Sequence, residues 1–268
     1  MKKNKIKIGV VGLGVIGSAC KYGFEKLGHE VLVHDIAFNT KLLDLLSCDI
    51  IYVCVPTPSN EDDSCDVSIV KSVVYDLNDL NYKGVIAIKS TVKPTTTESL
   101  RVETGLRICF VPEFLRERCS TSDFTENHDL LAIGTEDSEI YDLVKKCHGN
   151  YPKSYSQLHP TEAELLKYYS NSYNALKIIF ANEIYEICKA INIDYDKIKS
   201  TFIKRGTTKD LYLDVNDNFR GYAGVCLPKD TKALNAFIKE LNLDLKLFET
   251  IDNENNKFKK TVFNGMRK

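Results

Sequence analysis

The sequence predicts an α/β fold in which a Rossmann-like, doubly wound parallel sheet is followed by a long connecting helix and a small all-α domain. Over the first 155 residues, short apolar runs alternate with helical patterns, which is typical of parallel sheets. The first of these runs leads directly into the glycine-rich sequence GLGVIG. From about residue 160 the alternation ends, and apolar residues continue at helical spacing through Ile191. We therefore expect a sheet domain over residues 1–155 and a helical domain over residues 156–268.

The composition excludes several classes of protein. Because 36 basic residues nearly balance 37 acidic ones and no polybasic run occurs, we expect no binding to nucleic acid. No apolar run approaches the roughly 20 residues that cross a bilayer, and glycines interrupt the apolar start of the chain, which disfavours a membrane span or a secretory signal. The nine cysteines lack C-x-x-C spacing, so we expect reduced thiols in a cytoplasmic protein and no metal site.

The glycine-rich sequence follows an expected strand over 6–11 and opens an expected helix over 15–28. Glycines at this spacing let backbone N–H groups and the positive end of the helix approach a pyrophosphate. A second strand, over 30–34, ends at Asp35, whose carboxylate would bind the adenosine ribose and repel a 2′-phosphate, so NAD is favoured over NADP. The alternative is a βαβ unit that binds no dinucleotide. The residues expected to contact the cofactor here are Gly12, Gly14, Val15, Ile16, Gly17 and Asp35.

The remaining elements of the first domain follow in order after a short connection. Apolar runs predict strands over 49–55, 85–89, 107–111 and 130–133. Helical patterns occupy the intervals at 41–46, 66–80 and 137–147. Because strands alternate with helices, we expect the strands to be parallel and their carboxyl ends to share one edge of the sheet.

Chemically useful residues follow two of these strands. Thr91 precedes Pro94, so it would either face a ligand or cap a helix. Glu113 and Glu117 follow the strand over 107–111, at the edge where doubly wound folds bind ligands. The two carboxylates could act together on one substrate, or they could be solvated loop charges.

The second domain begins with a helix over 160–191, which at 1.5 Å per residue spans on the order of 45 Å. Thr161 and Glu164 could form a capping box at its start. Lys167 and Asn171 are four residues apart and therefore lie on one face of the helix. Such a helix could connect domains and support a dimer, although a lysine on a helix is ordinarily only solvated. Further helices are expected over 194–204, 228–242 and 245–257, before a basic tail over 257–268.

The segment GYAGVCLPKDT places Cys226 just before an expected helix. Pro228 suits the first helical position, where its missing N–H costs nothing. The helix dipole and the neighbouring Lys229 would both stabilise a thiolate, the nucleophilic form of cysteine. Gly221 and Gly224 would let the backbone approach a ligand closely. The alternative is a buried structural cysteine.

This segment resembles the active-site segment of the UDP-glucose/GDP-mannose dehydrogenase family, roughly G-[FY]-G-G-x-C-[FL]-P-K-D, with Ala223 in place of a glycine. Four other motifs resemble family motifs in the same order. They are Val55-Pro56-Thr57, Ser90-Thr91-Val92-Lys93-Pro94 with Thr95 in place of a glycine, Pro112-Glu113-Phe114-Leu115-Arg116-Glu117 with Arg118 in place of a glycine, and E-x-x-K-x-x-x-N from Glu164 to Asn171. The resemblance extends over about residues 6–258, and the second α/β unit with which family members continue is expected to be absent.

The resemblance implies NAD-dependent oxidation of the C6 hydroxyl of a nucleotide-sugar, UDP-glucose or a related UDP-sugar, to a uronic acid. Two NAD would be reduced per turnover. Cys226 would form a thiohemiacetal and then a thioester, while Lys167 and Asn171 stabilise the oxyanion. Asp230 would accept the first proton through a water near Thr91. Glu113, assisted by Glu117, would act as the base for thioester hydrolysis.

The resemblance also implies binding residues and partners. Further cofactor contacts are expected from Val55, Pro56, Thr57, Ser90, Thr91, Glu117 and Lys229. Substrate contacts are expected from Phe114, Leu115, Arg116, Lys167, Asn171, Phe219, Arg220, Gly221 and Cys226. The expected partners are the nucleotide-sugar and a second copy bound through the long helix. Two alternatives stay open: a truncated member that binds NAD without catalysis, and a 3-hydroxyacid dehydrogenase of the related 6-phosphogluconate dehydrogenase superfamily.

Overall fold

The structure, a computed structural model, describes residues 5–258 and divides the chain into two compact units. Unit 1 comprises the residues up to Pro58 together with Asp66–Lys167, and unit 2 comprises Ser59–Cys65 and the residues from Tyr168 onward. The boundary between these units falls within the long helix, between Lys167 and Tyr168, and the division into domains at residues 155 and 156 stays a prediction. The basic tail expected over 257–268 lies almost entirely outside the described residues.

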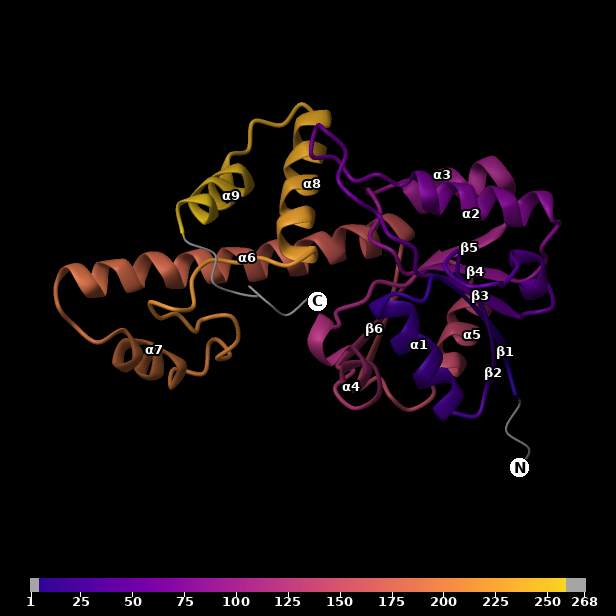
Figure 1. The fold of residues 1–268 in the computed structure, drawn as a ribbon, viewed down its shortest axis with the longest axis horizontal. Coiled ribbons are helices and arrows are strands. Elements are labelled where there is room, and N and C mark those ends of the chain that lie inside the picture. Colours follow the sequence, from indigo (N-terminus) through magenta and orange to yellow (C-terminus); the bar gives the residue numbers. More distant parts are fainter. Residues whose placement is uncertain (1–4, 259–268) are drawn as a thin grey trace. The chain divides into compact units, whose positions relative to one another are not determined.

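Unit 1 is built on a seven-stranded sheet in the order β2-β1-β3-β4-β5-β6-β7 (Figure 1). Every neighbouring pair is parallel except β5 and β6. The strands are β1 (Lys7–Val11), β2 (Glu30–His34), β3 (Ile50–Val53), β4 (Val85–Ile88), β5 (Arg107–Phe110), β6 (Leu130–Gly134) and β7 (Ser154–Leu158). The predicted α/β class is confirmed. Because the strand order reverses at β1, the carboxyl end of β1 is the position where such sheets bind their ligands.

Helices cover both faces of this sheet (Figure 1). On one face lie α1 (Val15–Lys26), α4 (Ser120–Thr125) and α5 (Ser138–His148), and their core includes Phe24, Tyr52 and Phe124. On the other face lie α2 (Ser68–Asp79), α3 (Thr96–Thr104) and the 3₁₀ helix η1 (Leu42–Leu45), with a core that includes Val74 and Leu100. Every residue of β3 and β4 is buried, which is why these strands are continuous apolar runs.

Four elements of unit 1 were missing from the sequence prediction: β7, α3, α4 and the 3₁₀ helix η2 (Glu117–Cys119). β7 is an edge strand whose sequence, SYSQL, is polar and has no buried residue, so no apolar pattern identifies it. α3 and α4 are short and rich in serine and threonine, which are weak helix formers. Their burial of Leu100 and Phe124 against the sheet stabilises them.

Unit 2 is helical. The long helix α6 (Pro160–Ala190) belongs to it from Tyr168 onward, followed by α7 (Tyr195–Ile203), α8 (Cys226–Glu240) and α9 (Leu247–Lys257). One core cluster joins Ala175, Ile179, Tyr222 and Ile251, and a second joins Ala181, Cys188, Tyr195, Leu213 and Val215. The segment 59–65 is part of this unit, where Asp63 forms an ion pair of 3.0 Å with Lys232 on α8. Within residues 5–258, no helix combines the length and apolarity that crossing a membrane requires.

Candidate active site

The glycine-rich turn between β1 and α1 has the geometry of a pyrophosphate site. Gly12 has φ +89°, and a Cβ there would lie 2.7 Å from the carbonyl oxygen of Cys54. A Cβ on Gly17 would lie 1.8 Å from the carbonyl oxygen of Gly12, so both positions require glycine. A Cβ on Gly14, by contrast, would point into open space. The first turn of α1, which begins with Val15 and Ile16, has no side-chain cap and no acidic residue. Its backbone N–H groups therefore suit a bound anion.

Asp35 lies directly after β2, beside this turn. Its Oδ2 accepts a hydrogen bond of 2.6 Å from the N–H of Leu13, and its Oδ1 accepts one of 2.8 Å from the N–H of Ala37. These two bonds lower the pKa of Asp35, so the carboxylate is ionised at neutral pH. A fixed carboxylate here fits the ribose hydroxyls of NAD and disfavours a 2′-phosphate.

Two further expected cofactor segments lie at the carboxyl ends of β3 and β4. The hydroxyl of Ser90 donates to the carbonyl oxygens of Val55, at 2.7 Å, and of Val53, at 3.3 Å, so it joins the two segments. Pro56 is exposed and Thr57 is buried. Thr91 is half-buried, and it is not a helix cap, because α3 begins only at Thr96.

A buried ion pair joins α6 to the PEFLRE segment after β5. The Nζ of Lys167 lies 2.7 Å from Oε1 of Glu113 and donates at 2.7 Å to the carbonyl oxygen of the same residue. The side chains of Lys167 and Glu113 are only 4% and 8% exposed. The N–H of Leu115 donates to Oε2 of Glu113 at 2.8 Å. Burial raises the pKa of Glu113, but the ammonium of Lys167 and these hydrogen bonds outweigh it and hold the pKa below its ordinary value.

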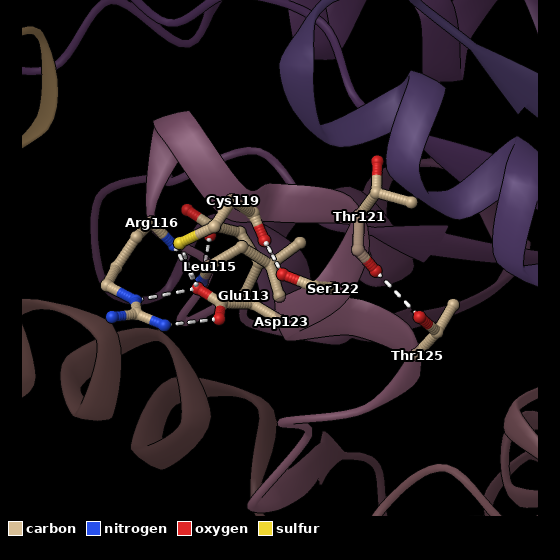
Figure 2. Close-up of polar contacts among 8 residues, drawn as sticks. All are labelled: Glu113, Leu115, Arg116, Cys119, Thr121, Ser122, Asp123 and Thr125. Carbon is tan, nitrogen blue, oxygen red and sulfur yellow. Dashed lines mark hydrogen bonds and ion pairs between the residues drawn. The ribbon is translucent and has the colours of Figure 1, made fainter.

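The rest of this segment is held by Asp123 on α4, as Figure 2 shows. The buried carboxylate of Asp123 accepts three hydrogen bonds from Arg116: 2.9 Å from the backbone N–H, 3.0 Å from Nε and 2.7 Å from Nη2. Phe114 and Leu115 are half-buried, and the ammonium of Lys167 lies 5.9 Å from the centre of the Phe114 ring. Glu117 is exposed at the start of the 3₁₀ helix η2 (Glu117–Cys119). The two glutamates of the motif therefore have different surroundings.

Unit 2 contains a second polar cluster around Asp230, which is fully buried. The Nδ2 of Asn171 donates to Oδ2 of Asp230 at 2.6 Å, and the Nζ of Lys229 lies 2.6 Å from Oδ1. Each carboxylate oxygen thus faces one predicted site residue. Asp230 fixes the side chains of Asn171 on α6 and of Lys229 on α8.

Cys226 is exposed and is the first residue of α8. The helix begins two residues earlier than the sequence predicted, so the cysteine lies within the first helical turn and Pro228 is the third helical residue. Proline is tolerated there because the first N–H groups of a helix have no intrahelical partner. The alternative of a buried structural cysteine is contradicted. The other eight thiols are buried or half-buried: Cys20, Cys48, Cys54, Cys65, Cys109, Cys119, Cys147 and Cys188.

The loop before α8 holds the last three expected substrate residues. Phe219 is exposed, whereas Arg220 is buried. The Nε of Arg220 donates to Oδ1 of Asn182 at 2.8 Å, its Nη2 bonds Glu186, and its guanidinium lies 5.0 Å from the ring centres of both Tyr185 and Phe258. These contacts fix the loop to α6. Gly221 has φ +60°, and a Cβ there would lie 2.7 Å from Oδ1 of Asn255, which accepts the N–H of Tyr222.

Sequence reasoning missed two residues that hold the site together. Asp123 lies in a serine- and threonine-rich stretch without a helical pattern. Glu164 was expected to cap its own helix with Thr161, but it bonds α3 instead. The N-terminal bond of α6 is made by Glu162, whose Oε2 accepts the N–H of His159 at 2.8 Å. Among the residues that the structure describes, no cluster of ligands suits a metal ion.

Comparison with known proteins identifies the family. Residues 37–151 match the NAD binding domain of the UDP-glucose/GDP-mannose dehydrogenase family, and residues 161–257 match its central domain. The chain belongs to this family. A UDP-glucose 6-dehydrogenase of Rickettsia bellii is 32% identical over 244 residues, which are 88% of this chain and 55% of that protein. The match to the family's NAD binding domain also confirms NAD as the cofactor.

Solved structures agree on the fold. A UDP-glucose dehydrogenase of Pyrobaculum islandicum matches with a TM-score of 0.84 and 26% identity, over 96% of this chain and 69% of that one. A 3-hydroxyisobutyrate dehydrogenase of Mycobacterium tuberculosis matches with a TM-score of 0.74 over 95% of this chain and 94% of that one, but at 14% identity, so this likeness shows the fold alone. The chain spans about half the length of the Rickettsia relative and about two thirds of the Pyrobaculum chain.

Proposed function

We propose that this protein oxidises the C6 hydroxyl of a nucleotide-sugar, with UDP-glucose as the first substrate to test, to the carboxylate of a uronic acid. The observation that carries the proposal is the buried ion pair between Lys167 and Glu113, 2.7 Å apart, at the carboxyl edge of the sheet of a family member. Such a pair provides both a donor for an oxyanion and a carboxylate that can act as a base.

The overall reaction requires two oxidation steps. The alcohol and one water yield the carboxylate, while two NAD⁺ become two NADH and three protons are released. Bound NAD⁺ supplies the hydride acceptor for each step. The first step leaves an aldehyde at C6, and the proposed proton acceptor is Asp230, through a water near Thr91.

Cys226 is the proposed nucleophile on this aldehyde. Its thiolate adds to C6, and the new S–C bond gives a thiohemiacetal whose oxyanion the ammonium of Lys167 and the amide of Asn171 stabilise. Loss of a hydride from C6 then converts it to a thioester. Water attacks the thioester carbon, the C–S bond breaks, and the thiol and the carboxylate are released. The exposure of Cys226 in the first turn of α8 supports this role.

The ion pair also suggests how Glu113 becomes a base. A base works best when its pKa is near the working pH, but Lys167 holds the pKa of Glu113 below its ordinary value. When the ammonium turns from Glu113 to the oxyanion of the substrate, burial raises the pKa of the carboxylate. Glu113 can then take a proton from the hydrolytic water, and Glu117 is proposed to assist.

A second copy of the chain is the proposed protein partner, through α6. Four large side chains on the part of α6 in unit 2 are between 50% and 70% exposed: Tyr169, Tyr173, Phe180 and Ile187. Their spacing of four, seven and seven residues places them on one face of the helix. Sedimentation of the whole chain tests this pairing.

The covalent role of Cys226 is tested by replacing it with serine. We expect wild type to release two NADH per sugar and form the acid, because the thioester allows the second oxidation. Cys226→Ser should form no acid and retain NAD binding, which chromatography of the products and calorimetry measure. The control is Cys119→Ser, because Cys119 donates to Asp123 and a serine hydroxyl can do the same.

The outcomes separate the alternatives. Acid formation by Cys226→Ser at the wild-type rate would refute the covalent role. One NADH per 3-hydroxyacid, insensitive to thiol alkylation, would favour the 3-hydroxyacid dehydrogenase. Binding of NAD without reduction on any UDP- or GDP-sugar would favour the non-catalytic homologue.

A further inference from the structure

Glu164 is a buried carboxylate without a role in the proposed chemistry. Its side chain lies in the first turns of α6 and is fully buried. Its Oε2 accepts a hydrogen bond of 2.6 Å from the N–H of Thr95, and its Oε1 accepts one of 2.7 Å from the N–H of Thr97. Both oxygens are thus directed at the N-terminus of α3, in the same unit.

The start of α3 needs such a partner. Thr95 occupies the N-cap position but its side chain makes no capping bond. It has φ +82°, a left-handed conformation that is strained for a β-branched residue. The N–H of Thr96 bonds the carbonyl oxygen of Lys93 at 3.1 Å, so Pro94 and Thr95 form the centre of a tight turn in which glycine is normally found at this position. The carboxylate from α6 therefore replaces the local cap and stabilises the strained residue.

The position of Glu164 gives this contact a consequence for the site. Glu164 lies three residues before Lys167 on α6, and Thr95 lies four residues after Thr91. Lys167 in turn bonds Glu113. One carboxylate thus joins the segment that carries Thr91 to the helix that carries the ion-paired lysine.

We propose that Glu164 is a positioning residue: by bonding the N–H groups of Thr95 and Thr97, it fixes the distance between Thr91 and the Lys167–Glu113 pair. The inference rests on the proposed function, because it assigns Thr91 and Lys167 to one reaction.

The chemistry of the contact supports more than ordinary capping. A serine or aspartate at the cap position would satisfy the helix locally, without burying a charge from another helix. Burial raises the pKa of Glu164 to about 7, although the N–H groups of Thr95 and Thr97 and the nearby His159 oppose the rise. Retaining so unfavourable a carboxylate is reasonable where a fixed geometry between two segments is needed.

The test compares Glu164→Gln with Glu162→Gln in the whole chain. Glutamine keeps the shape of Glu164 but directs an N–H₂ group at a backbone N–H, so one bond is lost. Glu162 is the matched control, because it lies in the same turn and its carboxylate accepts the N–H of His159 at the start of its own helix. We expect amide exchange of residues 91–97, followed by mass spectrometry, to become about tenfold faster in Glu164→Gln and to stay unchanged in Glu162→Gln.

The kinetic comparison separates positioning from a general structural role. We expect the kcat of Glu164→Gln to fall about tenfold or more while the KM for NAD stays within about twofold, since misplaced groups slow the reaction without weakening the dinucleotide site. Adding Thr95→Gly to Glu164→Gln should restore part of kcat, because glycine adopts positive φ without strain.

Unchanged amide exchange at residues 91–97, or an equal loss of kcat in both glutamine variants, would overturn the positioning role. If wild type reduces no NAD with any nucleotide-sugar, the proposed function fails, and the kinetic role of Glu164 fails with it. The exchange measurement then decides separately whether Glu164 holds this segment, since it needs no turnover.

Discussion

Two glutamates of unit 1, one on α6 and one bonded to it, are both buried, yet their environments shift their pKa values in opposite directions. Glu113, in the loop after β5, faces the ammonium of Lys167 at 2.7 Å, and its pKa lies below the ordinary value. Glu164, on α6, accepts two backbone N–H groups at 2.6 and 2.7 Å, and its pKa rises to about 7. Burial raises the pKa of both carboxylates. At Glu113 the positive charge of Lys167 outweighs this effect, whereas at Glu164 the two backbone N–H groups do not outweigh it.

The comparison shows how one residue type serves two purposes. Lys167 keeps Glu113 in the ionised state, which suits the base proposed for thioester hydrolysis. Glu164 has a pKa near neutral pH and accepts the backbone N–H groups of Thr95 and Thr97, which suits a group that holds structure. The following predictions test this difference.

The largest effect is expected from Lys167→Met. Methionine preserves much of the apolar stem but removes the cation, so the carboxylate of Glu113 is left buried without its partner. We expect the free energy of unfolding at pH 7 to fall by about 3–5 kcal/mol, measured by urea denaturation. Oxidation of the nucleotide-sugar should be lost as well.

The double variant Lys167→Met/Glu113→Gln is the control for this prediction. If the unpaired charge causes the loss, removing it should restore most of the stability without restoring activity. Equal unfolding free energies for the single and double variants would show that the charge of Glu113 is not the cause.

A smaller effect is expected in the pH dependence of stability. Glu164 has a pKa of about 7 in the folded chain and an ordinary value of 4.5, so the folded state binds more protons between these pH values. Glu164 therefore stabilises the folded state fully below pH 4.5, and this stabilisation, on the order of 3 kcal/mol, is lost as the pH rises through 7. The pH dependence of Glu113 is opposite: its stabilisation is present above pH 4.5 and is lost as the pH falls through its lowered pKa.

Urea unfolding of wild type and Glu164→Gln between pH 5 and pH 8 measures this contribution. Wild type should lose stability relative to the variant as the pH rises, because only wild type carries the buried carboxylate. A difference that stays constant with pH would contradict the assignment of a raised pKa to Glu164.

The smallest effect is expected from Thr95→Gly. Relief of the left-handed strain contributes on the order of 1–2 kcal/mol, and the added freedom of glycine in the unfolded chain costs about 0.5–1 kcal/mol. We therefore expect a net gain of about 1 kcal/mol or less, measured by thermal unfolding. A loss of stability would show that the threonine side chain has a favourable contact that outweighs its strain.

The sequence predicts much of the fold because the relevant signals are local. β3 and β4 are short continuous apolar runs, which are typical of buried strands, and Gly17 is required by a close approach to the carbonyl oxygen of Gly12 within one turn. β7 could not be predicted, because an edge strand needs no apolar pattern. α8 was placed two residues late, because proline at 228 is compatible with either the first or the third helical position.

The candidate site likewise was predictable only in part. Sequence motifs indicate four of its residues, Cys226, Lys167, Asn171 and Asp230, but they do not indicate which side chains these residues contact. Glu164 and Thr161 have the spacing of a capping box, yet Glu164 bonds residues 67 and 69 positions earlier. Asp123 and Asn255 bond backbone groups that only the folded chain brings near them.

The sequence by itself determined the alternation of strands and helices, the glycine turn and the choice of candidate site residues, because periodicity, backbone sterics and chemical type are properties of neighbouring residues. Only the tertiary structure decided which buried carboxylate meets a cation and which meets peptide groups. That choice depends on distances between segments far apart in the chain, and it sets the charge each carboxylate carries at neutral pH.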